Sequence, residues 1–354
     1  MASLTQDTLA RPAQHDADFA VRLWLWCVAA LVFAMIVVGG ATRLTDSGLS
    51  ITEWKPIMGA IPPLSDADWH DAFTKYKQIP EYHIVNKGMS LEAFKSIFWW
   101  EWAHRFLGRF IGLAFALPFA FFWATGRLRD GFAKKLALVL ALGAVQGGIG
   151  WYMVSSGLVD RVDVSQYRLA LHLSVAFLIL AALVWLALSL SPHQRPVATK
   201  AQRVLAGHMA GFVFVQVVLG AFVAGLKAGL AYNTWPDMNG DLIPPGLFAH
   251  TPWWANFFES ITLTQFNHRL MAYVVLAFAV VNLVLLVRMA ADRRIVTSAA
   301  ILLAAIVAQA AIGIWTLLAA VPLHLGLAHQ GGAAIVFALA TYLWWLSSNV
   351  TRSP

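Results

Sequence analysis

A chain of 354 residues in which 59% are apolar and only 12% are charged, with a mean hydropathy of +0.66, is typical of an integral membrane protein and excludes an ordinary soluble domain. The formal net charge of +7 does not indicate nucleic-acid binding, because the basic residues lie between apolar segments rather than on one face. The single cysteine, Cys27, lies in the first apolar segment, so an intramolecular disulfide is excluded.

Eight apolar segments each approach the ~20 residues that a helix needs to cross the ~30 Å hydrocarbon layer. The loops after the second, fourth and sixth segments are rich in Lys and Arg, whereas the loop after the seventh has no basic residue. Because basic loops stay on the cytoplasmic side, we predict cytoplasmic termini and external long loops at 42–98 and 227–264. The predicted spans are 21–41, 103–125, 133–155, 169–190, 204–226, 266–288, 295–318 and 326–347.

An internal repeat covers nearly the whole chain. GGATRLTDSGL at 39–49 aligns with GAFVAGLKAGL at 220–230, and QGGIG at 146–150 aligns with QAAIG at 309–313. Four spans per repeat insert both copies the same way up. We therefore predict an all-α integral membrane protein with eight transmembrane helices in two parallel, pseudo-symmetric four-helix bundles. Its predicted parts are a cytoplasmic N-terminal tail (1–20), an N-terminal bundle (21–190), a cytoplasmic linker (191–203), a C-terminal bundle (204–347) and a cytoplasmic tail (348–354).

Four histidines occupy repeat-related positions in even-numbered spans, near the outer face in this topology: His104, His172, His268 and His329. Ionisable residues within spans are costly and usually functional. Two facing helices with one histidine each form the usual clamp for haem inside a bundle, so we pair His104 with His172 and His268 with His329. A zinc site would need a third protein ligand, which only the first half offers. His324 is expected in a loop, although a register error would exchange it with His329.

The segment EWAHRFLGR opens the second predicted span, and QFNHRL opens the sixth. Residues three apart share a helix face, so Glu101 is expected to lie beside His104 and to point at whatever His104 binds. In the second copy Gln265 replaces Glu101, which suggests two similar ligands of which only one undergoes chemistry. We expect Glu101 to act as a catalytic proton acceptor or electrostatic stabiliser. The alternative is a structural salt bridge to Arg105.

Three arginines follow the histidines at short spacing: Arg105, Arg109 and Arg269. Guanidinium groups near the membrane interface can neutralise haem propionates, and we expect this supporting role for all three. The alternative is that these side chains only snorkel, extending from the span so that the guanidinium group lies at the membrane–water interface.

Several segments together resemble the haem A synthase family, the bacterial and mitochondrial enzymes that make haem A for cytochrome oxidase. The resemblance covers about residues 20 to 347 and is carried by GGATRLTDSGLSITEWKPIMGAIPP, EWAHRFLGR, QGGIGWYMVSSGL, AYNTWP, FNHR and GLAHQ. It is closest to the proteobacterial and mitochondrial branch. Some members carry a cysteine pair in the first outer loop; this chain has none there, so a thiol–disulfide role in that loop is excluded.

The resemblance implies a bacterial inner-membrane enzyme that oxidises the C8 methyl group of haem O to a formyl group by hydroxylation and dehydration. It implies that His268 and His329 ligate the iron of a resident haem b cofactor, while His104 and His172 in the N-terminal bundle receive the substrate haem. Expected partners are haem O, membrane lipid, haem O synthase, an unidentified electron acceptor and a second copy of the chain; nucleic acid is not among them. The alternative function is a di-haem b-type membrane electron-transfer protein, which would not need Glu101.

Overall fold

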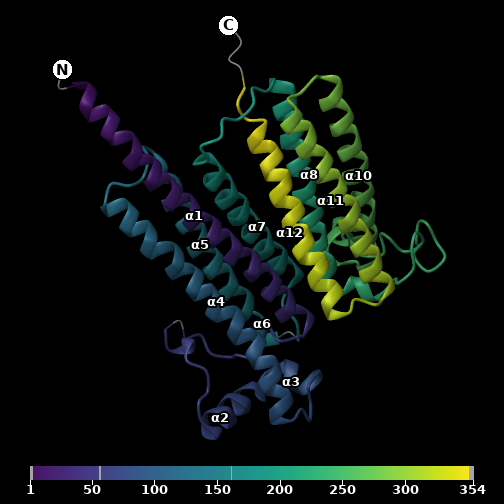
Figure 1. Ribbon diagram of the computed structural model, residues 1–354. Coiled ribbons are helices and arrows are strands. Elements are labelled where there is room, and N and C mark those ends of the chain that lie inside the picture. The colour runs from purple at the N-terminus through teal and green to yellow at the C-terminus, as the bar shows by residue number, and fades with distance from the viewer. Residues whose placement is uncertain (1–2, 56, 161, 351–354) are drawn as a thin grey trace.

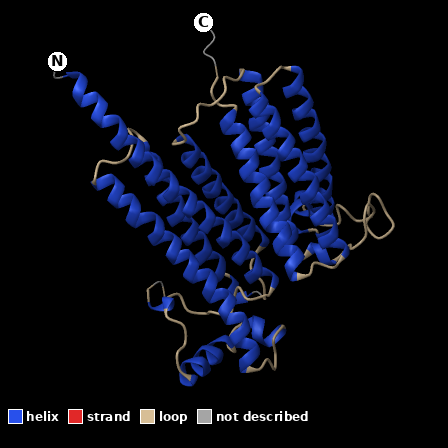
Figure 2. Cartoon of the chain, in the orientation of Figure 1, coloured by secondary structure: helices blue, strands red, loops and turns tan. Residues whose placement is uncertain are grey.

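The computed structural model describes residues 3–55, 57–160 and 162–350, and nearly all of their regular structure is helical (Figure 2). Within these residues, eight helices are long and apolar enough to cross a membrane, which confirms the predicted fold class. They are α1 (Ser3–Leu44), α4 (Leu91–Ala124), α5 (Phe132–Ser155), α7 (Gln166–Ser189), α8 (Lys200–Gly225), α10 (Ile261–Arg288), α11 (Arg293–Leu318) and α12 (Leu323–Leu346), with α1 and α4 the longest. Six of the eight start and end within five residues of the predicted spans, whereas α1 and α4 begin well before theirs.

The sequence analysis placed Glu101 and His104 at the opening of the second span. The helix α4 instead begins at Leu91, so both residues lie well inside it. Ser90 caps the helix by accepting a hydrogen bond from the Ala93 amide at 3.2 Å. Phe94, in the first turn of α4, is fully buried against Trp69 and Phe73 of the first long loop. This packing stabilises the part of α4 that precedes the apolar span. Hydropathy alone locates the membrane-crossing part of such a helix and misses its polar extension.

The long helices form two groups that stand side by side (Figure 1). In the N-terminal group α1 packs against α4 and α7, and α5 packs against α7; in the C-terminal group α8 packs against α10 and α12, and α11 against α12. The beginning of α1 and the end of α12 lie at the same end of the molecule (Figure 1). This arrangement agrees with two four-helix bundles inserted the same way up. Of the predicted tails, residues 3–20 belong to α1, while residues 1–2 and 351–354 lie outside the described residues.

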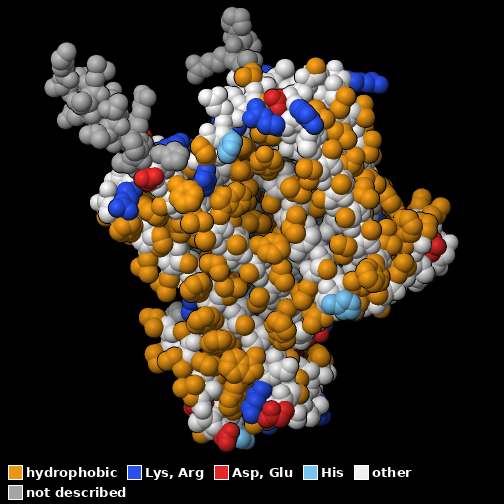
Figure 3. Space-filling model, in the orientation of Figure 1, with side chains coloured by type: hydrophobic (Ala, Val, Ile, Leu, Met, Phe, Trp, Pro, Cys, Tyr) orange, Lys and Arg blue, Asp and Glu red, His pale blue; other side chains and the backbone are white. Residues whose placement is uncertain are grey.

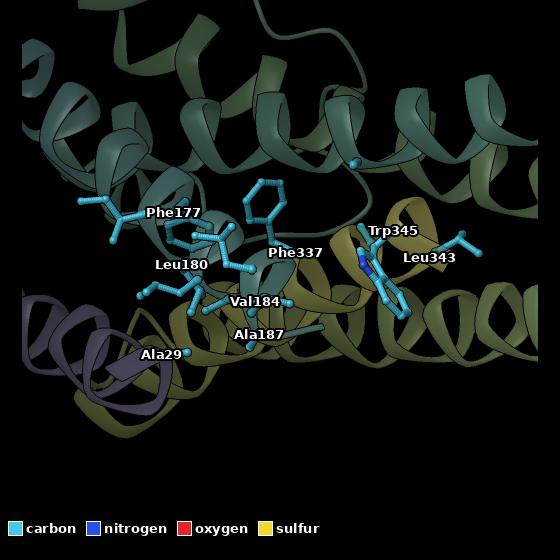
Figure 4. Close-up of a cluster of buried hydrophobic side chains, with 14 of the residues drawn as sticks. Ala29, Phe177, Leu180, Val184, Ala187, Phe337, Leu343 and Trp345 are labelled. Atoms are coloured by element: carbon cyan, nitrogen blue, oxygen red, sulfur yellow. The ribbon is translucent and has the colours of Figure 1, made fainter. Parts of the chain in front are cut away.

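The two bundles meet along α1, α7, α8 and α12, where the largest apolar cluster lies (Figure 4). Phe177 and Leu183 of α7 and Phe337 of α12 are almost completely buried there, with the Phe177 and Phe337 rings 5.7 Å apart. On the face that Figure 3 shows, apolar side chains cover the middle of the molecule, and charged side chains gather toward its two ends. This is the surface expected of helices that contact lipid.

The first long loop, which we predict to be external, folds into the short helices η1 (Met58–Ala60), α2 (Asp66–Tyr76) and α3 (Pro80–Ile84) at one end of the molecule (Figure 1). A further short helix, α6 (Gly157–Asp160), follows α5. Ser65 and Asp68 form a capping box at the start of α2, and Trp69 and Phe73 of α2 pack with Phe94 of α4. The second external loop contains η2 (Ala228–Leu230), η3 (Trp253–Ala255) and α9 (Asn256–Glu259). Both loops therefore cover the ends of the helices that carry the histidines.

Candidate functional site

The four predicted histidines form two pairs, one in each bundle. The ring centroids of His104 on α4 and His172 on α7 are 6.5 Å apart, and those of His268 on α10 and His329 on α12 are 6.4 Å apart. A metal–imidazole nitrogen bond is about 2.0 Å long, so two axial imidazoles on one iron place their centroids roughly 6 Å apart. The separation in both bundles therefore fits a single iron between the two rings.

No cluster of three His, Cys, Asp or Glu side chains that could hold a metal occurs among the described residues. The pairs thus offer two protein ligands each, which is the donor set of a haem iron and not of a structural zinc. His324, expected in a loop, lies instead in the first turn of α12, because that helix begins at Leu323. The ring that faces His268 is that of His329, as predicted.

A glycine on a neighbouring helix faces each of the four imidazoles. A methyl group added at Gly313 would lie 2.6 Å from the Cε1 atom of the histidine, closer than real side-chain contacts allow, and at the other three glycines it would lie at a tight 3.0–3.1 Å. A glycine thus lets each imidazole pack closely against the neighbouring helix, and at Gly313 no larger residue fits without displacing the ring. The pairs are Gly39 with His104, Gly150 with His172, Gly220 with His268, and Gly313 with His329. Gly39 and Gly220 are equivalent in the repeat, as are Gly150 and Gly313, so both bundles build the site in the same way.

Three glutamines also contact the histidines, a feature that the sequence analysis did not identify as functional. The Nε2 atom of Gln146 on α5 donates to the backbone oxygen of His172 at 3.0 Å. Gln216 on α8 and Gln309 on α11 donate in the same way to His268 at 3.1 Å and to His329 at 2.7 Å. The repeated QGGIG and QAAIG motifs contained this signal, since Gln146 and Gln309 open them.

Glu101 is 3% exposed, and its carboxylate accepts four hydrogen bonds. Its Oε2 atom accepts from the Ser50 hydroxyl and the Ile51 amide, both at 2.7 Å. Its Oε1 atom accepts from Arg105, from Nε at 3.0 Å and from Nη2 at 2.6 Å. This is the geometry of the salt-bridge alternative, and it ties the first external loop to α4. The catalytic role of Glu101 remains a prediction.

In the second bundle Gln265 also ties a loop to its helix, but it donates hydrogen bonds to the loop where Glu101 accepts them. Gln265 donates through Nε2 to the backbone oxygens of Ala228 at 2.8 Å and Tyr232 at 3.3 Å, and its Oε1 accepts from Arg269 at 3.1 Å. A glutamine is needed there because the loop presents carbonyl acceptors, whereas Ser50 and Ile51 present donors to Glu101. The Glu-to-Gln difference between the halves thus has a structural reason that is independent of catalysis.

The three arginines bond the same loops. Arg105 donates to the backbone oxygens of Ile51 at 2.8 Å and Glu53 at 3.1 Å, and Arg109 donates to that of Lys55 at 3.1 Å. Arg269 donates to the backbone oxygen of Asp237 at 2.8 Å. Each arginine therefore anchors an external loop next to a histidine pair. Their contact with haem propionates remains a prediction.

An ionic cluster joins the two bundles at the same end of the molecule. Arg43 at the end of α1 contacts Asp46 at 3.0 Å and Asp163 at 3.4 Å, and donates to the Ala224 backbone oxygen of α8 at 3.2 Å. Lys227 contacts the same two carboxylates at 3.0 and 3.2 Å. The cluster thus connects loops of both halves, which the linear sequence did not reveal.

Glu81 of α3 lies beside this cluster and is 3% exposed. Together with Arg43 and Asp163 it lines a cavity of about 30 Å³, and its Oε2 atom has no hydrogen-bond partner. Burial, with repulsion from Glu101, Asp46 and Asp163 as smaller causes, raises the pKa of Glu81 to about 8. Glu81 is therefore protonated at neutral pH.

Comparison with known proteins places this geometry in a family context. Residues 22–341 match the COX15-CtaA family, described as Cytochrome oxidase assembly protein. A protein of Chelativorans sp. (strain BNC1) named Heme A synthase is 55% identical over 324 residues, which cover 92% of this chain and 90% of that protein. Proteins of the same name from Mesorhizobium japonicum and Parvibaculum lavamentivorans are each 53% identical, over 92% and 91% of this chain and 89% and 93% of their own lengths.

Proposed function

The chain belongs to the cytochrome oxidase assembly protein family, and from that premise we propose that it is a haem A synthase of the bacterial inner membrane. The similarity to proteins named Heme A synthase, at about half of all positions over nine-tenths of the chain, supports this function. The proposed reaction oxidises the C8 methyl group of haem O to a formyl group. Two hydroxylations of that carbon with oxygen taken from water, each releasing two electrons and two protons, and the loss of one water complete it; the four electrons pass to an acceptor outside the chain.

The observation that carries the proposal is the pair of matching histidine sites, only one of which has a carboxylate one helical turn before its first histidine. His104 and His172 are three and 71 residues along the chain from Glu101 in the N-terminal bundle, whereas the position of Glu101 is taken by the neutral Gln265 in the C-terminal bundle. Two permanent electron-transfer haems would not require this difference. A substrate site in the N-terminal bundle would give the Glu101 carboxylate a use in addition to its bonds to Ser50 and Ile51.

In the proposed enzyme the C-terminal pair, His268 and His329, holds a haem b, which supplies one-electron redox chemistry when bound. His104 and His172 hold the iron of the substrate haem. Gly39 and Gly150 leave the space in which these two imidazoles stand. The residues of the chain thus orient the substrate through its iron and leave its methyl group to be oxidised.

Arg105, Arg109 and Arg269 close the external loops over the two sites and bring positive charge to the outer end of each bundle. That charge suits the carboxylates of haem side chains. We retain Glu101 as the proposed proton acceptor or stabiliser of developing positive charge in the N-terminal site. Its four hydrogen bonds mean that accepting a proton would require it to release at least one partner.

The test is co-expression with a source of haem O, followed by purification in detergent and chromatography of the extracted haems. We expect haem b together with haem O or haem A from the unaltered chain. His268→Ala and His329→Ala should lose haem b, because each removes one axial bond. His172→Ala should keep haem b and produce no haem A.

The same extraction distinguishes the alternative. Two haem b groups per chain and no haem A, with haem O present in the cells, would identify a di-haem electron-transfer protein instead. Retention of full haem b by His268→Ala would disprove the assignment of the cofactor to the C-terminal pair.

A further inference from the structure

Three of the four histidines share a neighbour that the fourth lacks. Gln146, Gln216 and Gln309 each lie one helical turn before the glycine that faces a histidine, at 150, 220 and 313. Each glutamine donates Nε2 to the backbone oxygen of that histidine. In each of the three, the Oε1 atom is buried and has no hydrogen-bond partner. Unpaired buried acceptors are rare and costly. Three of them, each in the same position relative to a histidine, therefore indicate that each amide oxygen gains a partner when the histidine binds iron.

The imidazole itself can provide that partner. The Nε2 atom of Gln216 lies 3.1 Å from His268 Nδ1 and 3.4 Å from His268 Nε2, and that of Gln309 lies 3.0 Å from His329 Nδ1. The Nδ1 atom of His172, next to Gln146, is buried without a partner. The amides of Gln216 and Gln309 are therefore within reach of Nδ1, the ring nitrogen left free when Nε2 is the iron ligand. Gln146 bonds the backbone oxygen of His172, whose Nδ1 still lacks a partner.

Binding of iron through Nε2 fixes the proton of a neutral imidazole on Nδ1, which then must donate. An amide nitrogen is a donor and cannot accept that proton, but the unpaired Oε1 of the same amide can, after rotation of the amide group. The histidine backbone oxygen that loses the glutamine bond lies within a helix and keeps its helical partner. Ligand histidines commonly donate their second nitrogen in this way, which orients the ring and increases its basicity.

The fourth histidine differs at one position. In the repeat alignment Met35 of α1 is equivalent to Gln216 of α8, just as Gly39 is equivalent to Gly220. The Cε atom of Met35 lies 3.4 Å from where a Cβ at Gly108 would stand, one turn beyond His104 on α4. A thioether is a weak acceptor, so it cannot replace the amide oxygen. In the described part of the chain, no glutamine side chain bonds His104.

We propose that Gln146, Gln216 and Gln309 are positioning residues that accept the Nδ1 proton of His172, His268 and His329, and that Met35 makes His104 the weakest of the four iron ligands. The C-terminal pair then has two supported ligands and keeps its haem. The N-terminal pair has one supported and one unsupported ligand and can release its haem. This inference rests on the proposed function, since it explains why one of two matching sites exchanges a substrate while the other retains a cofactor.

Replacing the supporting glutamines by methionine, and Met35 by glutamine, tests the proposal. Gln216→Met and Gln309→Met introduce the residue that the chain itself carries at position 35. Both purified variants should lose haem b to apomyoglobin faster and bind it roughly 10–100-fold more weakly. Their haem midpoint potential should rise, because a less basic imidazole stabilises ferric iron less. Gln309→Glu keeps an acceptor at this place and should restore retention with a lowered potential.

The reverse change is Met35→Gln, which gives His104 the missing partner. We expect this variant to hold haem in its N-terminal site through purification, and to release haem A product more slowly. Gln330→Met is the matched control: Gln330 donates to the Ile36 backbone oxygen at 2.7 Å across a helix interface but contacts no histidine ring in any hydrogen bond. It should leave haem retention and midpoint potential unchanged.

The outcomes separate this proposal from the proposed function. Unchanged haem b affinity and midpoint potential in both Gln216→Met and Gln309→Met would overturn the role of the glutamines, even if the chain makes haem A. Absence of haem A from the unaltered chain would overturn the synthase function and leave the spectroscopic comparison of the C-terminal haem valid. If Gln330→Met shifts the potential as much as Gln309→Met, the effect comes from packing, and the proposal is wrong.

Discussion

The replacement Glu101→Gln tests whether the carboxylate holds the first external loop on α4. The glutamine keeps the size of the side chain and has only one oxygen, so it cannot accept from both Arg105 and the Ser50–Ile51 pair as Glu101 does. Either the buried Ile51 amide or the Arg105 guanidinium loses its acceptor. The first loss costs about 1–3 kcal/mol. Removal of the partner of a buried charge costs about 3–5 kcal/mol.

Arg105 keeps two backbone acceptors, and its side chain is 13% exposed. The cost should therefore lie near the lower end of that range, at about 3 kcal/mol. Because the bonds join a loop to a helix, the loss should appear as local opening of the loop around Ile51 more than as unfolding of the bundle. Hydrogen exchange of the Ile51 amide in detergent measures this directly, and about 3 kcal/mol corresponds to roughly a hundredfold loss of protection.

Ser50→Ala is the control, since it removes one hydrogen bond to the same oxygen and keeps the charge, at a cost of about 1 kcal/mol. If Glu101→Gln leaves the protection of Ile51 at the unaltered level, the reasoning from these contacts is refuted. Haem A output divides the remaining roles of Glu101. Normal output from Ser50→Ala with none from Glu101→Gln favours the proton acceptor; parallel losses in both favour positioning alone.

Three further outcomes are expected. Gly313→Ala places a methyl group 2.6 Å from His329 Cε1 and should displace the ring, so the purified protein should lose most of its haem b absorbance; normal absorbance would contradict this packing. The pKa of Glu81 is raised from 4.5 to about 8, so its contribution to stability is complete below about pH 4.5 and is lost as pH rises through 8. Glu81→Gln should therefore flatten the fall in melting temperature between about pH 4.5 and 8, and an equally steep fall would disprove the shift. Reporter fusions after residue 130 should be cytoplasmic and those within 240–250 external, and the reverse pattern would invert the predicted topology.

The sequence by itself determined the membrane class, the eight spans and the pairing of the histidines. These features depend on local hydropathy and on a repeat that can be aligned residue by residue, so no tertiary information is needed to find them. His104 and His172 could be paired from the sequence because His268 and His329 recur at the same places in the second copy. Each motif that carries the family resemblance is an unbroken run of residues, so it can be recognised from the sequence alone.

The tertiary structure alone decided which partner each polar side chain has. Sequence spacing placed Glu101 on the face of His104, but its carboxylate turns to Ser50 and Ile51, about 50 residues away in a loop whose path no periodicity predicts. Likewise, the approach of Gln309 to His329 depends on the rotation of α11 against α12. Hydropathy leaves that rotation undetermined, because a span that is apolar on most of its surface has no single preferred face toward its neighbours.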